Sequence, residues 1–236
     1  MNYKSDRICV IGTSQVSALK KFIDTSNKIP VTVDFFGSNN SAYINRSIKY
    51  NDANGTIEAL SDTIREAWGK TAGKTHIKLS DYSRAIVFGC DQFEYRNRFF
   101  LDYHKTFLST SCVKQLLLDC WATHPANVIL TELEKYNLKL PISVRNGPFF
   151  SVKHNYFVNA PADFDFSESR ILYEKFMHQA CGELGARFFP QPTESVGPNG
   201  ITTIERYLLE DGFHLTKEAA GEFFLSMISI DELNCP

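Results

Sequence analysis

Short, continuously apolar runs recur along the chain, and several of them end at a glycine. The first, Ile8–Ile11, is followed by Gly12, and such a run is typical of a strand that is buried on both faces of a parallel sheet. Runs of this kind predict strands at residues 8–11, 31–36, 84–88, 141–145 and 186–189.

Between the runs, apolar residues recur every three or four positions, which predicts amphipathic helices. Val16, Leu19 and Ile23, for example, share one helical face. Helices are predicted on this basis at residues 15–26, 57–68, 110–122, 125–136, 167–184 and 216–230, with a short one near Ile204. The polar stretch 38–55 is rich in Asn and Ser and predicts a long loop.

Strands that alternate with helices indicate an α/β protein whose parallel sheet is covered on both faces. The 236 residues contain no internal repeat, no low-complexity tract and no linker that would divide them. We therefore expect residues 1–236 to form a single domain.

Composition and charge narrow the range of partners. Hydrophobic residues make up 43% of the chain and charged residues 22%, which are ordinary values for a globular protein. The formal net charge is −2 and no basic run occurs, so no nucleic-acid partner is expected. No apolar run approaches the roughly 18 residues that span a bilayer, and the polar N-terminus does not resemble a signal peptide. These features predict a cytoplasmic protein without a membrane partner.

The cysteines are scattered and form neither a C-x-x-C pair nor a zinc-finger spacing with histidine. We expect reduced, mostly buried thiols, and we expect neither a metal nor another cofactor. The six residues are Cys9, Cys90, Cys112, Cys120, Cys181 and Cys235. The histidines that lack a partner pattern are expected to be structural, and they are His76, His104, His124, His154 and His178.

Polar residues follow three of the predicted strands, at the positions where ligands bind in open parallel sheets. The three sequences are Gly12-Thr13-Ser14, Gly37-Ser38-Asn39 and Gly89-Cys90-Asp91. A glycine lets the backbone turn sharply and lets a peptide N–H approach a ligand closely. We expect the three strand ends to form one shallow cleft.

Ser14 lies where the first predicted strand gives way to the first helix. Its hydroxyl is either an N-cap, a common use of serine at such a position, or a nucleophile beside N–H groups that favour negative charge. Asp211 and His214 favour the second interpretation, because residues three apart are neighbours on a helical turn. Asp211 would orient His214, and His214 would accept the proton of Ser14.

Together, Gly12-Thr13-Ser14 and the sequence from Asp211 to His214 resemble the first and last motifs of the SGNH (GDSL-like) hydrolases. The resemblance extends over essentially the whole chain. It implies a three-layer α/β/α sandwich with a mostly parallel, flavodoxin-like sheet, and a triad of Ser14, His214 and Asp211. Thr13 stands where the family usually has an aspartate that takes no part in proton transfer.

The resemblance also implies an oxyanion hole made by the N–H groups of Ser14 and Gly37 and by a third donor at the position of Asp91. The family has an asparagine there, whereas an ionised aspartate carries only acceptors. Three explanations stay open: Asp91 is protonated in an apolar site, a nearby amide donates in its place, or the activity is weak or altered. The candidate amides are Asn39, Asn40 and Asn97.

We therefore expect a serine esterase that acts on a small-molecule or glycan ester. The alternatives are an acyltransferase on the same scaffold and a non-catalytic ligand-binding protein that has kept the fold. The aromatic stretch 93–103 could flank the cleft against a sugar face, although aromatic residues are more often part of the core. The sequence contains no G-x-S-x-G nucleophile elbow and no glycine pattern of a nucleotide-binding loop.

Overall fold

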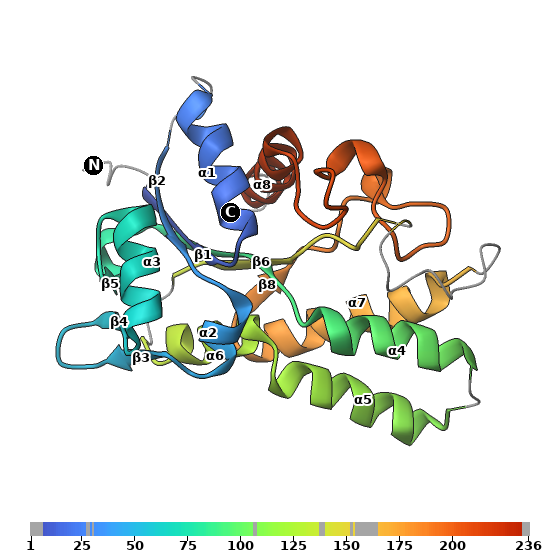
Figure 1. The fold of residues 1–236 in the computed structure, drawn as a ribbon. Helices are drawn as coiled ribbons and strands as arrows, with labels where there is room; N and C mark the ends of the chain where they lie inside the picture. Colours follow the sequence, from blue (N-terminus) through green and yellow to red (C-terminus); the bar gives the residue numbers. More distant parts are fainter. Residues whose placement is uncertain are drawn as a thin grey trace.

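The computed structural model (Figure 1) describes residues 7–26, 29, 31–105, 108–136, 140–151, 153 and 165–232. Its central sheet has the strand order β2-β1-β6-β7-β8, and all neighbouring strands are parallel. The strands are β1 (Arg7–Gly12), β2 (Thr32–Gly37), β6 (Arg84–Cys90), β7 (Ile142–Asn146) and β8 (Ala186–Phe188). Every strand predicted from an apolar run is confirmed.

Helices cover both faces of this sheet and give a three-layer α/β/α sandwich (Figure 1). One face carries α1 (Gln15–Thr25) and α8 (Lys217–Glu232). The other side carries α4 (Phe93–Lys105), α5 (Thr110–Ala122), α6 (Pro125–Glu134) and α7 (Ser167–Glu183). The helices predicted at residues 15–26, 110–122, 125–136, 167–184 and 216–230 are confirmed, whereas α4, which contains the aromatic stretch 93–103, was not predicted.

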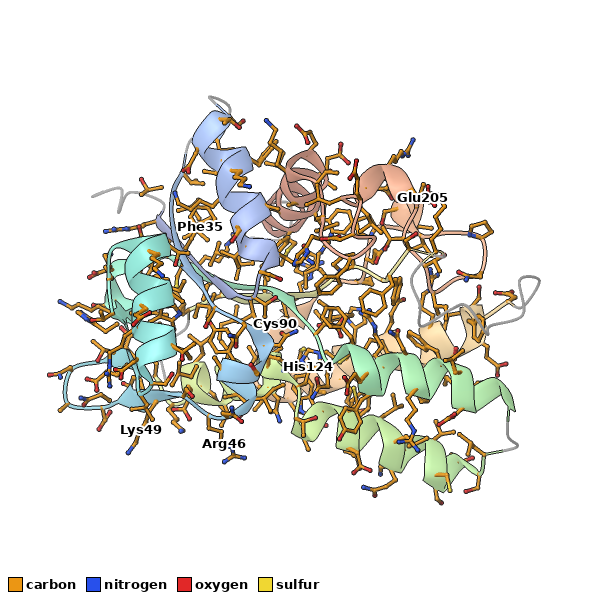
Figure 2. The ribbon with its side chains drawn as sticks, in the orientation of Figure 1. Phe35, Arg46, Lys49, Cys90, His124 and Glu205 are labelled. Carbon is orange, nitrogen blue, oxygen red and sulfur yellow. The ribbon has the colours of Figure 1, made fainter. Side chains whose placement is uncertain are left out.

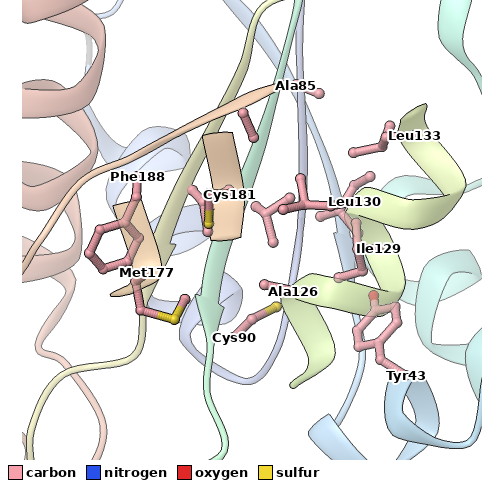
Figure 3. Close-up of a cluster of buried hydrophobic side chains, with 14 of the residues drawn as sticks. Tyr43, Ala85, Cys90, Ala126, Ile129, Leu130, Leu133, Met177, Cys181 and Phe188 are labelled. Carbon is pink, nitrogen blue, oxygen red and sulfur yellow. The ribbon is translucent and has the colours of Figure 1, made fainter. Parts of the chain in front are cut away.

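Successive strand residues are buried on opposite faces of the sheet, which explains why the strand sequences are continuously apolar. Val10 and Phe88 belong to a core that includes Phe223 of α8. Cys9 and Val87 belong to a second core on the other face. Figure 3 shows this second core, in which α6 and α7 contribute Ala126, Ile129, Leu130, Leu133, Met177 and Cys181.

Residues 38–78 differ from the sequence prediction. The predicted loop 38–55 contains a short helix and a strand, and the predicted helix 57–68 begins as a strand. The elements are α2 (Asn40–Ile44), β3 (Ile48–Asn51), β4 (Thr56–Ala59), α3 (Asp62–Ala72) and β5 (His76–Lys78). The three strands form a small antiparallel sheet in the order β3-β4-β5.

Local signals account for these differences. In β4, Ile57 and Ala59 are both buried, and a two-residue repeat of buried positions is typical of a strand. The Ser61 hydroxyl then accepts a hydrogen bond from a backbone N–H in the first turn of α3, so the helix begins after the strand. Asn39 caps α2 in the same way.

One charged residue interrupts the apolar sequence of β2. The Asp34 carboxylate lies 2.8 Å from Arg7, 2.9 Å from Lys74 and 2.6 Å from the Tyr82 hydroxyl. Burial raises the pKa of this carboxyl, but the hydrogen bonds from Tyr82 and Lys74 and the two positive charges outweigh burial, so its pKa lies below the ordinary value. The network joins β2 to β1 and to the segment that follows α3.

The cysteines agree with the prediction of mostly buried thiols. Cys112 on α5 is exposed and Cys235 lies outside the described residues. The buried free cysteines are Cys9, Cys90, Cys120 and Cys181. Within the described part of the chain, no helix is long and apolar enough to cross a bilayer, and no group of His, Cys, Asp or Glu side chains is arranged to hold a metal ion.

Candidate active site

The turn after β1 is fixed by its contact with β6. A Cβ on Gly12 would overlap the carbonyl of Phe88, so only glycine fits there. Thr13 is buried and donates from Oγ1 to the Gly89 carbonyl, 2.5 Å away. Gly89 has a φ of 72°, a left-handed conformation that favours glycine. These contacts set the direction in which Ser14 leaves the sheet.

Ser14, His214 and Asp211 lie in one hydrogen-bonded chain, although Ser14 and His214 are 200 residues apart in the sequence. The Ser14 Oγ is 2.9 Å from His214 Nε2, and His214 Nδ1 is 2.7 Å from Asp211 Oδ2. Asp211 Oδ1 also accepts from the backbone N–H groups of Phe213 and His214, at 2.9 Å each. The structure thus brings together the three residues that the sequence motifs predict.

The Ser14 hydroxyl makes no capping hydrogen bond to α1, although the residue occupies the N-cap position. The hydroxyl instead contacts His214 and is exposed to solvent. Of the two uses that the sequence leaves open for this side chain, the observed contact fits a nucleophile better than an N-cap.

Asp211 is held in its ionised form. Partial burial raises the pKa of the carboxyl, but hydrogen bonds from the His214 and Phe213 backbone and from the His214 ring outweigh burial, and the pKa lies below its ordinary value. An ionised carboxylate at Nδ1 places the ring proton on that nitrogen and leaves Nε2 with a lone pair toward Ser14.

Gln15 connects the serine segment to the histidine segment. Its side chain is buried, donates from Nε2 to the Phe213 carbonyl at 3.1 Å and accepts from the Leu215 N–H at 2.9 Å. The two backbone groups flank His214, so one amide fixes the chain on either side of the imidazole. The sequence does not indicate this role, because its pattern predicts only that Gln15 begins a helix.

Aromatic rings support the same segment from the other side. Phe213 packs edge-on against Phe93 of α4, with ring centroids 4.8 Å apart, and lies 5.3 Å from Phe150. The Phe213 and His214 rings are themselves 4.4 Å apart. The expectation that residues 93–103 flank a sugar-binding cleft gains no support here, because Phe93 packs beneath the histidine segment.

The sequence matches no protein-family model and no curated protein, whereas several solved structures resemble the fold. Among solved structures, a protein from Streptococcus pneumonia provisionally described as a platelet activating factor has a TM-score of 0.52 and 12% identity, over 98% of this chain and 86% of its own. A provisionally described acylhydrolase from Bacteroides fragilis has a TM-score of 0.50 and 12% identity, and the match covers 98% of this chain and 89% of the other. A GDSL-like lipase from Bacteroides thetaiotaomicron has a TM-score of 0.49 and 12% identity, and the match covers 97% of this chain and 88% of the other.

The chain shares its fold with these solved structures, in agreement with the expected SGNH (GDSL-like) architecture. At this level of identity the likeness establishes the fold alone, so the chemistry has to be argued from the site itself.

The oxyanion hole of the SGNH fold remains a prediction for this chain. Among the described residues, no partner is seen for the Ser14 N–H, which lies at the start of α1. The Gly37 N–H donates to Thr71 Oγ1 at 3.3 Å, so it would have to leave that oxygen to serve an oxyanion. The third donor position, Asp91, has a different role.

Asp91 lies in a buried ion pair at the end of β6. Its carboxylate contacts the Arg96 guanidinium, and both side chains are almost fully buried. Arg96 also donates to the Gly147 and Pro148 carbonyls, at 3.3 and 3.2 Å. Burial raises the pKa of Asp91 to about 7 and outweighs the opposing effect of Arg96. The geometry favours a structural role that ties α4 to the segment after β7.

The neighbouring amides differ in their freedom to act as donors. Asn97 is buried, and both of its amide atoms lack a partner among the described residues. Asn40 has a buried Oδ1 without a partner. Asn39 uses Oδ1 to accept from Ala42 and Ser41, at 2.7 and 2.9 Å, and no described group accepts from its NH₂. Asn39 is therefore the exposed amide with donors to spare.

The remaining described histidines have structural surroundings. His124 is buried beneath the sheet near Cys90 (Figure 2), and its Nδ1 accepts from the Ala126 N–H at the start of α6. Burial lowers the pKa of His124 to about 3. His178 packs edge-on against Phe188, and His76 is exposed on β5. The His104 side chain and His154 lie outside what the structure describes.

Proposed function

We propose that the protein is a serine acyl-ester hydrolase that uses Ser14 as nucleophile. The observation that carries the proposal is the continuous contact from Ser14 Oγ through the His214 ring to Asp211. Serine and histidine at this distance, with the histidine oriented by a carboxylate, form the arrangement that activates a hydroxyl for acyl transfer.

In the first half-reaction, Ser14 Oγ attacks the carbonyl carbon of the ester while His214 Nε2 takes the hydroxyl proton. The tetrahedral intermediate collapses, the C–O bond to the alcohol breaks, and His214 returns its proton to the leaving oxygen. The acyl group is then bonded to Ser14. In the second half-reaction, His214 takes a proton from water, the hydroxide attacks the acyl carbon, and Ser14 Oγ leaves with the proton that His214 returns.

The negative oxygen of each intermediate needs donors. The Ser14 N–H begins α1, where the helix dipole also favours negative charge. We assign the side-chain donor to Asn39, in place of the family asparagine. Gly12 pairs with Gly37 in the parallel ladder, so Ser14 and Asn39 each leave adjacent strands two residues beyond a paired glycine. Adjacent strands lie about 4.8 Å apart, so the backbone segments that carry the two residues are neighbours at the strand ends.

The proposal is tested by steady-state hydrolysis of p-nitrophenyl acetate. Ser14→Ala and His214→Ala should each lower kcat by about 10⁴-fold or more. Ser226→Ala and His178→Ala are matched controls on α8 and α7, and both should retain the activity of the unchanged protein. Equal turnover by the Ser14→Ala variant would contradict the proposal.

An acyltransferase would use the same first half-reaction, with an alcohol in place of water in the second. Adding a sugar alcohol to the assay separates the two activities. A hydrolase releases free acid at an unchanged yield, whereas a transferase diverts the acyl group to the added hydroxyl.

A further inference from the structure

A cavity of about 560 Å³ opens directly beside Ser14 and His214. This volume lies within the range of about 300–1,000 Å³ that is typical of sites for small-molecule ligands. One face of α1, the first residues of α8 and Leu209 form its walls. The cavity is therefore placed to hold the part of a substrate that extends from the ester toward α1.

The α1 wall follows a single helical stripe. Ser14, Ser17, Ala18 and Lys21 are spaced by three and four residues, so they share one face of the helix. Lys21 lies seven residues beyond Ser14, and at 1.5 Å per residue the two backbone positions are about 10 Å apart. Part of the lining is apolar, since it includes Ala18, Leu209 and Leu215, and Leu209 is 50% exposed.

The charged side chains that line the cavity are mostly positive. Lys21 and Lys217 line it, and Glu218 is the single acidic lining residue, so these side chains carry a net formal charge of +1. Lys217 Nζ is 3.6 Å from Glu218, and no described acidic group pairs with Lys21. The neighbouring Lys20 differs, because it pairs with Asp24 at 2.8 Å and does not line the cavity.

We propose that this cavity selects esters that carry a carboxylate or phosphate about 10 Å from the reacting carbonyl, bound by Lys21 and Lys217. The spacer between the ester and the anionic group would lie against the apolar lining residues Ala18 and Leu209. This inference rests on the proposed function, since it assumes that Ser14 attacks the ester. It adds a substrate class: anionic esters with an extended spacer rather than small neutral acetates.

The test compares two matched pairs of esters. On the acyl side, mono-p-nitrophenyl suberate and p-nitrophenyl octanoate differ in one terminal carboxylate. On the alcohol side, acetylated glucuronate and acetylated glucose differ in the same way, and acetylated glucose 6-phosphate replaces the carboxylate with a phosphate. We expect kcat/KM to be about tenfold higher for the anionic member of one pair, and which pair responds shows which part of the substrate enters the cavity.

The lysine variants decide the cause of such a preference. Lys21→Ala combined with Lys217→Ala should abolish the preference for the anionic ester while turnover of the neutral esters persists. Lys21→Glu should reverse this preference. Lys20→Ala should leave the preference unchanged. Raising the salt concentration to about 1 M should weaken it, because exposed charges are then screened within about 3 Å.

Two results would overturn the inference: equal kcat/KM within both pairs, or a preference that survives the double lysine variant. Failure of the proposed function has a different signature, namely no dependence of neutral-ester hydrolysis on Ser14. In that case calorimetric titration of the Ser14→Ala variant with suberate, with and without Lys21→Ala, still tests the anion site.

Discussion

Gln15 provides a quantitative test of how the site is held together. We consider Gln15→Met, which keeps the length of the side chain and removes both hydrogen bonds. The Leu215 N–H is buried, and a buried donor without a partner costs about 1–3 kcal/mol. The Phe213 carbonyl is partly exposed, and its lost hydrogen bond costs about 0.5–1.5 kcal/mol. The substitution should therefore lower the free energy of unfolding by about 1.5–4.5 kcal/mol.

Both hydrogen bonds lost in Gln15→Met flank His214. We therefore expect kcat to fall by a larger factor than the loss of folded protein alone would cause. Asp211 still holds the imidazole locally, so the ring and its carboxylate move together relative to Ser14. A displacement of 1 Å at a reacting group costs about 100-fold in rate. We expect kcat for p-nitrophenyl acetate to fall by about 10-fold to 100-fold at temperatures where the variant is folded, with KM changed less than twofold. Gln15→Glu keeps the acceptor for Leu215 and should be intermediate.

Gln191 offers a matched control. Its side chain accepts from the Phe149 N–H and donates to Thr203 Oγ1, at 2.9 Å each, and contacts none of residues 211–215. Gln191→Met should therefore lower stability without a comparable loss of kcat. Urea unfolding supplies the stabilities and steady-state kinetics supply kcat. Equal effects of the two substitutions on kcat, or an unchanged kcat in Gln15→Met, would refute the positioning role.

Three further predictions follow from the charges and amides around the sheet. Asn39→Asp keeps the helix cap of α2 but removes the amide donor, so kcat should fall by about 100-fold to 1000-fold with little change in stability; an unchanged kcat would exclude Asn39 from the oxyanion hole. The pKa of Asp91 is raised to about 7, so its contribution to stability is present below about pH 4 and is lost as the pH rises toward 7. In urea titrations at several pH values, Asp91→Asn should show a smaller decline in the free energy of unfolding over this range. The substitution should not increase kcat. The pKa of Asp34 is lowered, so its contribution to stability is present at neutral pH and is lost on acidification. Asp34→Asn should lower the free energy of unfolding by about 1.5–3 kcal/mol at pH 7. A difference in stability from the unchanged protein that persists far below pH 4 would contradict this prediction.

The sheet could be predicted from the sequence because burial on both faces leaves a plain signal. Strands such as Ile8–Ile11 must be apolar at every position, and the glycines after them mark the strand ends. The small antiparallel sheet could not be predicted in the same way. Its strands have three or four residues, too few to distinguish the two-residue period of a strand from the 3.6-residue period of a helix. In addition, only two residues separate β4 from α3.

The contact of Ser14 with His214 and Asp211 could be predicted because these residues lie in short local motifs near the two ends of the chain. The contacts that hold those motifs together could not. Gln15 acts on backbone groups near residue 214, and a backbone partner leaves no trace in the sequence. The pairing of Asp91 with Arg96 could not be predicted either, although the two residues are only five positions apart, because only the fold shows that both side chains are buried.

The proposed hydrolase activity requires an activated Ser14, and covalent labelling tests this requirement most directly. A fluorophosphonate probe reacts with a serine hydroxyl whose proton is taken by an adjacent base. Intact mass spectrometry should show one adduct on the unchanged protein, none on Ser14→Ala and slower labelling of Asp211→Asn. Folded protein that acquires no adduct, or a Ser14→Ala variant that labels as fast as the unchanged protein, would contradict the account.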